Sequence, residues 1–245
     1  MISASIVLFN ENLETLKKTV DSFLKTPIEK KLYLIDNSSK NTLENHFKQP
    51  EIEYIFVGKN IGFGKAHNLV LNKIKSEFHL LLNPDVEFKP LVLSNLIEVL
   101  EENINVSFIT PKVVYLNEHY QYVCRKHPTF FDLINRKLKI SKNQILKNEY
   151  QNCDLEKPFY PEFIHGCFML FKTDDFKKLK GFDECYFLYM EDADICRKIE
   201  KSGKKILYYP NEKIIHHHQK GSSKKLKLFF YHLLSAFKYF LKWGF

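Results

Sequence analysis

Short apolar runs alternate with amphipathic segments through the first half of the chain. Runs rich in β-branched and aromatic residues have the length of buried strands and lie at 2–9, 31–35, 52–57, 78–82 and near 106–109. Between them, apolar residues recur at helical spacing in 13–24, 64–74 and 91–102. Strands that alternate with helices in this way predict βαβ units. We therefore expect an α/β fold with a Rossmann-like, mostly parallel mixed sheet flanked by helices.

The pattern weakens between Leu116 and Glu162, where Lys and Asn become frequent. We interpret 116–162 as a variable insertion over a cleft, with short helices around 132–138 and 143–148. Regular elements then return as an interrupted apolar strand at 163–171, a helix near 174–179, a helix from 191 to about 201 and a strand at 204–208. This predicts a body over 1–222, made of 1–115, 116–162 and 163–222, and a helical tail over 223–245.

The formal charge of +8 is concentrated in the tail. Residues 220–245 contain six lysines and no acid, which leaves +2 for the 219 residues before them. A nearly neutral body without a basic stripe argues against a nucleic-acid-binding protein. The five cysteines form no CxxC pair, and neither a signal peptide nor an apolar run of membrane-spanning length is visible. We therefore expect a reduced, cytoplasmic protein.

Polar residues cluster where the predicted strands end. Asn10 follows the first strand, Asp36-Asn37 the second, and Asn60 and Gly62 the third, while Asn83 and Asp85 follow the fourth. In parallel α/β sheets, ligands bind at the carboxyl ends of the strands. A polar ligand is therefore expected across one edge of the sheet, with Mg²⁺ or Mn²⁺ at the rigid Asn83-Pro84-Asp85 turn, although a turn closed by proline explains the same residues.

Gly62-Phe63-Gly64 follows a strand and precedes a helix, which is one half of a dinucleotide-binding pattern. His67 stands at the third glycine position, where it would crowd the contact between helix and strand. Two glycines also suit an ordinary tight turn. We therefore give an NAD site a low rank among the possible ligand sites.

Three carboxylates, Glu191, Asp192 and Asp194, lie beside a group of aromatic residues. Acids next to apolar rings are typical of a cleft that holds a carboxylate for proton transfer, although a helix N-terminus also favours acids. Downstream, a strand over Ile214-Ile215 would put His216 and His218 on one side and His217 on the other. At most two of these histidines can therefore approach one metal ion.

In order along the chain, several motifs together resemble glycosyltransferase family 2, and its rhamnosyltransferase-like bacterial branch most closely. The resemblance covers about residues 2–223 outside the insertion. Its motifs are Ser5-Ile6-Val7-Leu8-Phe9-Asn10, Leu34-Ile35-Asp36-Asn37-Ser38-Ser39, Asn60 to Asn68, Leu81-Leu82-Asn83-Pro84-Asp85, His165 to Leu170, Gly181-Phe182-Asp183-Glu184 and Glu191-Asp192-Ala193-Asp194.

The resemblance implies a GT-A fold, a nucleotide-sugar donor and a divalent cation, Mn²⁺ or Mg²⁺. Asp192 matches the catalytic base, with Glu191 and Asp194 as flanking acids. Asp85 matches the metal-binding carboxylate, and His216, favoured over His218 by motif position, matches the metal-binding histidine. The resemblance assigns the donor to Phe9, Asn10, Asp36, Asn37, Asn60, Gly62, Phe63, Asn68, Asn83 and Gly166.

The implied reaction is an inverting transfer to a saccharide acceptor carried on a polyprenyl lipid, in the synthesis of a bacterial surface polysaccharide such as O-antigen. A base deprotonates the acceptor hydroxyl, and the metal neutralises the departing diphosphate. The first choice of donor is dTDP-L-rhamnose, and the alternative is a UDP-sugar. The rival functions are a sugar-nucleotide pyrophosphorylase and an inactive, glycosyltransferase-like binding subunit.

The tail from 223 to 245 has an apolar helical stripe, with lysines outside it. Such a helix either packs on its own domain or lies on an anionic bilayer, where each lysine contributes about 1 kcal/mol. A lipid-linked acceptor favours the second choice. We therefore expect a cytoplasmic protein that is peripheral on the inner face of the plasma membrane.

Overall fold

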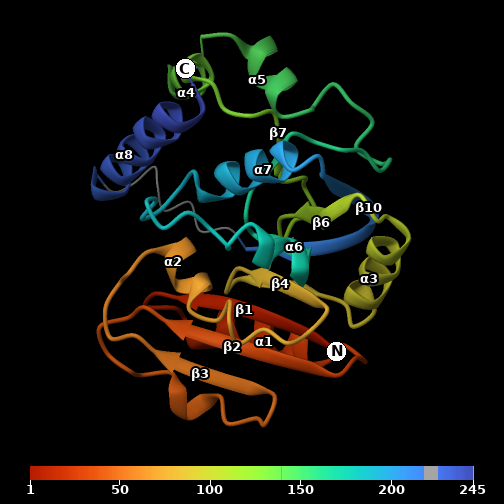
Figure 1. Cartoon of the computed structure of the whole chain (residues 1–245), viewed down its shortest axis with the longest axis vertical. Helices are drawn as coiled ribbons and strands as arrows, with labels where there is room; N and C mark the ends of the chain where they lie inside the picture. The colour runs from red at the N-terminus through yellow and green to blue at the C-terminus, as the bar shows by residue number, and fades with distance from the viewer. Residues whose placement is uncertain (139, 218–225, 245) are drawn as a thin grey trace.

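A mixed sheet of eight strands forms the centre of the computed structural model, which describes residues 1–138, 140–217 and 226–244 (Figure 1). The strand order is β3-β2-β1-β4-β9-β6-β10-β5. The first four strands in sequence are parallel to one another: β1 (Ile2–Leu8), β2 (Lys30–Asp36), β3 (Ile52–Phe56) and β4 (Phe78–Leu82). This half of the sheet confirms the predicted βαβ units.

The other half of the sheet mixes strand directions. Its strands are β9 (Phe168–Lys172), which runs antiparallel to both neighbours, β6 (Val106–Val114), β10 (Lys205–His216), which is parallel to β6, and the antiparallel edge strand β5 (Val86–Phe88). A small second sheet pairs β7 (Cys124–Arg125) with β8 (Phe163–Ile164). The prediction of a mostly parallel mixed sheet is confirmed.

Strand β1 is buried along its whole length because helices cover both of its faces. Right-handed crossovers put α1 (Leu13–Leu24), between β1 and β2, and α2 (Phe63–Asn68), between β3 and β4, on opposite sides of the sheet. The side chain of Asn12 caps α1 by accepting a hydrogen bond from the backbone N–H of Thr15.

The face of β1 toward α2 carries a buried polar chain rather than apolar side chains. Ser5 contacts His67 Nδ1 at 2.8 Å and His79 Nε2 at 2.9 Å, and Ser3 contacts His79 Nδ1 at 2.7 Å. Both histidines are fully buried. Loss of hydration lowers the pKa of each to about 3, so both are neutral in the folded protein.

The remaining helices flank the sheet or lie in the segment 116–162. They are the 3₁₀-helix Glu44–His46, α3 (Val92–Glu102), α4 (Phe130–Leu138), α5 (Lys142–Asn148), α6 (Thr173–Lys178), α7 (Glu191–Lys201) and α8 (Leu226–Trp243). In the described ranges, no helix has both the length and the apolarity that crossing a bilayer requires. All five cysteines are described, and all are free thiols.

Three predicted elements have clearly different bounds in the structure. The strand predicted near 106–109 continues to Val114. The helix predicted to reach residue 74 ends at Asn68, because the following N–H groups bond three residues back, as Leu71 does to Asn68 at 3.1 Å. The strand predicted over 204–208 continues to His216, past a register shift between Tyr209 and Lys213. The short strand β5 was not predicted.

Candidate active site

The polar residues at the strand ends do gather at one edge of the sheet. β1, β2, β3 and β4 are parallel, so their carboxyl ends lie together, and the ends of β6 and β10 point the same way (Figure 1). Because β9 is antiparallel, the segment before it, which contains Gly166, starts at this edge too. The topology therefore brings all the strand-end candidates to a single side of the molecule.

Asp36, at the end of β2, is fully buried, and both of its carboxylate oxygens accept hydrogen bonds. Oδ1 accepts from the backbone N–H of Ser38 at 2.9 Å, and Oδ2 accepts from the hydroxyl of Tyr54 at 2.6 Å. Burial, together with this bond to Asp36, raises the pKa of Tyr54. Ser38 in turn accepts from the backbone N–H of Asn10 at 2.8 Å, which ties the β1 and β2 loops together. Phe9 is half exposed beside them.

A second group joins the β2 end to the loop before α2. Asn37 donates to the carbonyl of Gly62 at 3.0 Å, and Asn60 accepts from the N–H of Gly62 at 3.0 Å. Gly62 has a φ of 96°, and a Cβ there would lie 2.5 Å from the carbonyl oxygen of Phe187. The backbone of Phe63 donates to that same oxygen at 3.1 Å. Only glycine fits this close approach.

Asn68, at the end of α2, has its side chain bonded to a distant loop. Its amide nitrogen donates to the carbonyl of Phe182 at 2.9 Å, and its oxygen accepts from the N–H of Phe182 at 3.0 Å. This pair of bonds fixes α2 against the loop that leads to α7. The expected contact of Asn68 with a nucleotide stays a prediction.

Asp85 and His216 face each other across the β4 and β10 ends. Asp85 Oδ1 lies 3.2 Å from His216 Nε2, and the Asn83 amide lies 3.4 Å from the same nitrogen. Gln121 holds the other ring nitrogen of His216 at 2.9 Å. Burial lowers the pKa of His216, but Cys167 and Asp85 outweigh it and raise the pKa to about 10.

The described residues fit a metal ion only in part. Among them, no three His, Cys, Asp or Glu side chains form a group that could hold a metal ion. Asp85 and His216 nevertheless place a carboxylate and an imidazole side by side. Mg²⁺ and Mn²⁺ often bind to only a few protein ligands and complete their coordination with substrate phosphates and water. As expected for alternating strand positions, His217 points elsewhere and contacts Glu87 at 2.6 Å. His218 lies outside the described residues.

The three acids that open α7 point in three different directions. Glu191 is buried, close to Gly64 of α2, and burial and the charge of Asp192 raise its pKa to about 8. Asp194 is fully buried and bonds to the tail, accepting from Trp243 Nε1 at 2.8 Å and pairing with Lys242 at 2.7 Å. Asp192 alone of the three is partly exposed.

The segment Gly166-Cys167 connects Asp192 to the residues around Asp85. Asp192 Oδ2 accepts from the backbone N–H of Gly166 at 3.2 Å, and the carbonyl of Cys167 accepts from the N–H of Asn83 at 3.0 Å. A Cβ on Gly166 would lie 3.3 Å from the Cβ of Asp192. Glycine here therefore lets the backbone approach α7 closely.

One further acid, Glu11, belongs to this edge and was not predicted from the sequence. It accepts weakly from the backbone N–H of Phe9 at 3.4 Å. Burial first, and then the charges of Asp85 and Asp36, raise the pKa of Glu11 to about 7. Its only sequence signal is its place two residues after a strand end, which also suits an ordinary loop acid.

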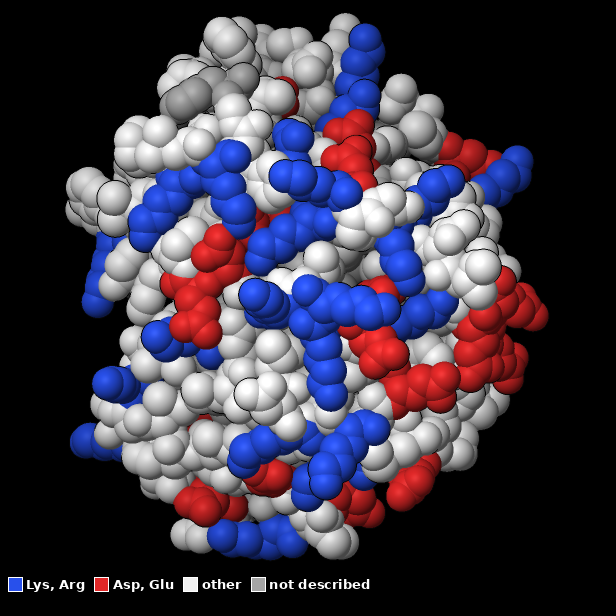
Figure 2. Space-filling view, viewed as in Figure 1, with Lys and Arg blue, Asp and Glu red and all other residues white. Residues whose placement is uncertain are grey.

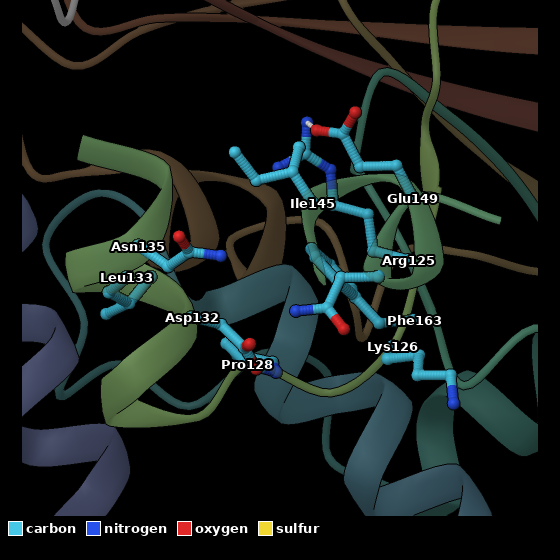
Figure 3. A pocket seen from close by; sticks show the side chains of 10 residues that line it. Arg125, Lys126, Pro128, Asp132, Leu133, Asn135, Ile145, Glu149 and Phe163 are labelled. Carbon is cyan, nitrogen blue, oxygen red and sulfur yellow. Dashed lines mark ion pairs between the residues drawn. The ribbon is translucent and has the colours of Figure 1, made fainter. Parts of the chain in front are cut away.

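A small hollow lies between α4 and α5 (Figure 3). It holds about 50 Å³, and its wall includes Leu133, Ile145 and the ion pair between Arg125 and Glu149, whose charged atoms are 3.3 Å apart. It is not part of the strand-end site.

The mixed sheet and its flanking helices have the GT-A glycosyltransferase fold. GalNAc-T7, solved with UDP, GalNAc and Mn²⁺, superposes with a TM-score of 0.69 at 18% identity over 90% of this chain and 43% of its own. The mannosyltransferase PcManGT of Pyrobaculum calidifontis, solved with GDP-Man and Mn²⁺, gives a TM-score of 0.62 at 14% identity over 90% of this chain and 57% of its own.

Sequence comparison defines the family. Residues 3–180 match glycosyl transferase family 2, so the chain belongs to that family, and residues 146–220 match the N-terminal domain of galactosyltransferase. The chain is similar to the rhamnosyltransferase WbbL of Escherichia coli, with 27% identity over 96% of this chain and 90% of that protein. It is 21% identical to the N-acetylglucosaminyl-diphospho-decaprenol L-rhamnosyltransferase of Mycobacterium tuberculosis, over 75% of this chain and 65% of that one.

Proposed function

We propose that this glycosyltransferase inverts the donor sugar's anomeric carbon, with Asp192 as the base. The observation that carries this proposal is the separation of the three acids on α7. Glu191 and Asp194 are buried and directed at α2 and α8, whereas Asp192 is partly exposed and held by Gly166 at 3.2 Å. A carboxylate fixed at the cleft takes the proton of the acceptor hydroxyl as that hydroxyl attacks.

The donor we propose is a nucleotide sugar, with dTDP-L-rhamnose first and a UDP-sugar second. Two similar proteins carry the name rhamnosyltransferase, which supports the first choice. Asp36 and the loop from Asn60 to Phe63 line the side of the sheet where the nucleotide would bind. The Asp36 carboxylate is fully buried and accepts hydrogen bonds from Ser38 and Tyr54, so it orders the loop after β2, and its direct contact with a base or ribose would need a change in that loop.

Asp85 and His216 are the residues that would hold the divalent cation, Mn²⁺ or Mg²⁺. When bound, the cation neutralises charge on the leaving diphosphate. Ligation through His216 requires the neutral imidazole, and because the pKa of His216 is raised to about 10, metal binding would release a proton from it. Metal binding should therefore strengthen as the pH rises.

The acceptor we propose is a saccharide on a polyprenyl carrier, at the inner face of the plasma membrane, for a surface polysaccharide such as O-antigen. The mycobacterial relative is named for a decaprenol-linked acceptor. The family match weighs against a sugar-nucleotide pyrophosphorylase. An inactive binding subunit is the remaining alternative, and the following experiment separates it from an enzyme.

The test is a screen for donor hydrolysis across dTDP- and UDP-sugars with Mn²⁺ or Mg²⁺, because hydrolysis needs no acceptor. We expect Asp192→Asn to keep nucleotide and metal binding by calorimetry, and to lose about 10²-fold or more in turnover. Asp21→Asn, an exposed acid on α1, is the matched control and should behave like the wild type. Near-normal turnover of Asp192→Asn would remove it as the base, and a wild type without metal-dependent nucleotide binding would favour the inactive subunit.

A further inference from the structure

Helix α8 has two distinct long faces, and only one of them packs on the protein. Ser235, Ala236, Tyr239 and Phe240 are buried against the body. On that side, Ser235 donates to the carbonyl of Leu188 at 2.8 Å, and Arg197 donates to the hydroxyl of Tyr239 at 2.9 Å. The helix is therefore firmly docked, and the expectation that it packs on its own domain is met by this face.

The other face of α8 is apolar and exposed. Its large side chains are between 47% and 80% exposed and are Leu226, Phe230, Leu233, Leu234, Phe237 and Leu241. Their spacing places them on one stripe covering about 100° of the helix circumference. A stripe of this kind on a docked helix is not part of the core.

Helix α4 of the insertion continues this apolar surface. Phe130 contacts Phe240 of α8 edge to face, with ring centroids 6.2 Å apart. Next to it, Phe131 is 80% exposed, and Leu138 and Ile140 are exposed as well. Figure 1 shows α4 and α8 at the same end of the molecule. We call these exposed side chains of α4 and α8, together with Ile140, the α4–α8 surface.

The positive charge of the chain is concentrated in the same two segments. Residues 220–245 carry six lysines and no acid, and residues 129–142 carry four basic residues and one acid. Because the whole chain has a net charge of +8, the other 205 residues together carry −1. In Figure 2, the corner of the molecule that α8 occupies is mainly white and blue.

We propose that the α4–α8 surface docks on an anionic lipid bilayer. Exposed apolar side chains on two segments of net positive charge match the acyl and headgroup layers of such a bilayer. Lys238 and Lys242 bond to the body of the protein, so the attraction comes from the net charge of these segments. A second copy of this chain fits less well, because a two-fold contact would bring the two basic segments of each copy against those of the other. This proposal rests on the proposed function in one respect: a lipid-carried acceptor would give the protein a reason to dock on a bilayer.

Vesicle flotation tests the proposal without donor or acceptor. The full chain should float with vesicles containing phosphatidylglycerol, float much less with pure phosphatidylcholine, and be released by high salt. The double variant Phe131→Ser/Phe237→Ser should bind at least tenfold more weakly. The control Ile104→Ser removes an equally exposed apolar residue outside the surface and should change nothing.

Several results would overturn the proposal. These are absence of vesicle binding, equal binding by the double variant, or equal binding to neutral and anionic vesicles. A dimer in light scattering that Phe131→Ser/Phe237→Ser dissociates would replace the bilayer with a second copy. Donor hydrolysis by the double variant should match the wild type, so vesicle binding by a chain that hydrolyses no donor would disprove only the proposed function.

Discussion

The buried histidine pair should make the protein sensitive to acid well above the range in which carboxylates are protonated. His67 and His79 each have a pKa lowered to about 3 in the fold, against about 6.5 in the unfolded chain. Below pH 6.5 the unfolded chain therefore binds protons that the folded protein does not. By linkage, stability is lost as the pH falls from 6.5 toward 3.

The size of this effect follows from the shift. At pH 5, which lies about 1.5 pH units below the pKa of histidine in the unfolded chain, each histidine lowers the free energy of unfolding by about 2 kcal/mol. The pair lowers it by about 4 kcal/mol. Domains are stable by only about 5–15 kcal/mol, so the loss is large. Ser5 bonds to both rings, which means that protonation of either one disturbs the same buried chain.

Urea unfolding at pH 7.5 and pH 5 measures the effect. His79→Gln keeps a polar side chain but cannot titrate. We expect it to be less stable than the wild type at pH 7.5 and to lose about 2 kcal/mol less on acidification. His119→Gln, at an exposed histidine, should retain the full loss of the wild type. If His79→Gln shows the same acid loss as the wild type, the burial argument is wrong.

Three further predictions concern the edge of the sheet. Glu191→Gln removes a buried carboxyl whose pKa is raised to about 8 in the folded protein. The wild type loses stability as the pH rises from about 4.5 to 8, because this carboxyl must ionise while buried. The variant should lose less stability than the wild type over that range in thermal melts. Gly62→Ala should lower the melting temperature clearly more than Gly203→Ala, since both have positive φ but only Gly62 faces a carbonyl oxygen at 2.5 Å, and equal shifts would refute this. Asp194→Asn removes the carboxylate that two lysines pair with and should make α8 more sensitive to limited proteolysis, while donor hydrolysis falls far less than in Asp192→Asn.

The parallel half of the sheet was predictable because each strand is a short run rich in aliphatic and aromatic residues that ends in a polar turn. The second half was less so. The last strand was predicted to end at Tyr208, yet β10 continues past Pro210 and a register shift to His216. A bulge accommodates the proline that a regular central strand excludes. Strand β5, at three residues, is too short to show any period.

The placement of the candidate site residues at one edge of the sheet was predictable, but the contacts that they make were not. Asn68 bonds to a loop 114 residues away, and Asp194 bonds to Trp243 in the tail. The sequence around Asn68 or Asp194 does not indicate either partner. A resemblance between sequences groups such residues with the active site, and only the structure separates a buried residue that fixes an element from a partly exposed one such as Asp192.

Helix geometry explains how one short acidic motif contacts three parts of the molecule. Successive residues of an α-helix are turned by about 100°, so Glu191, Asp192 and Asp194 leave the axis in different directions. Glu191 approaches α2, Asp192 bonds to the backbone before β9, and Asp194 bonds to α8. The helix that carries the proposed base therefore also fixes the tail helix. If the α4–α8 surface lies on a bilayer, the orientation of the cleft toward a lipid-carried acceptor is set through this single turn of α7.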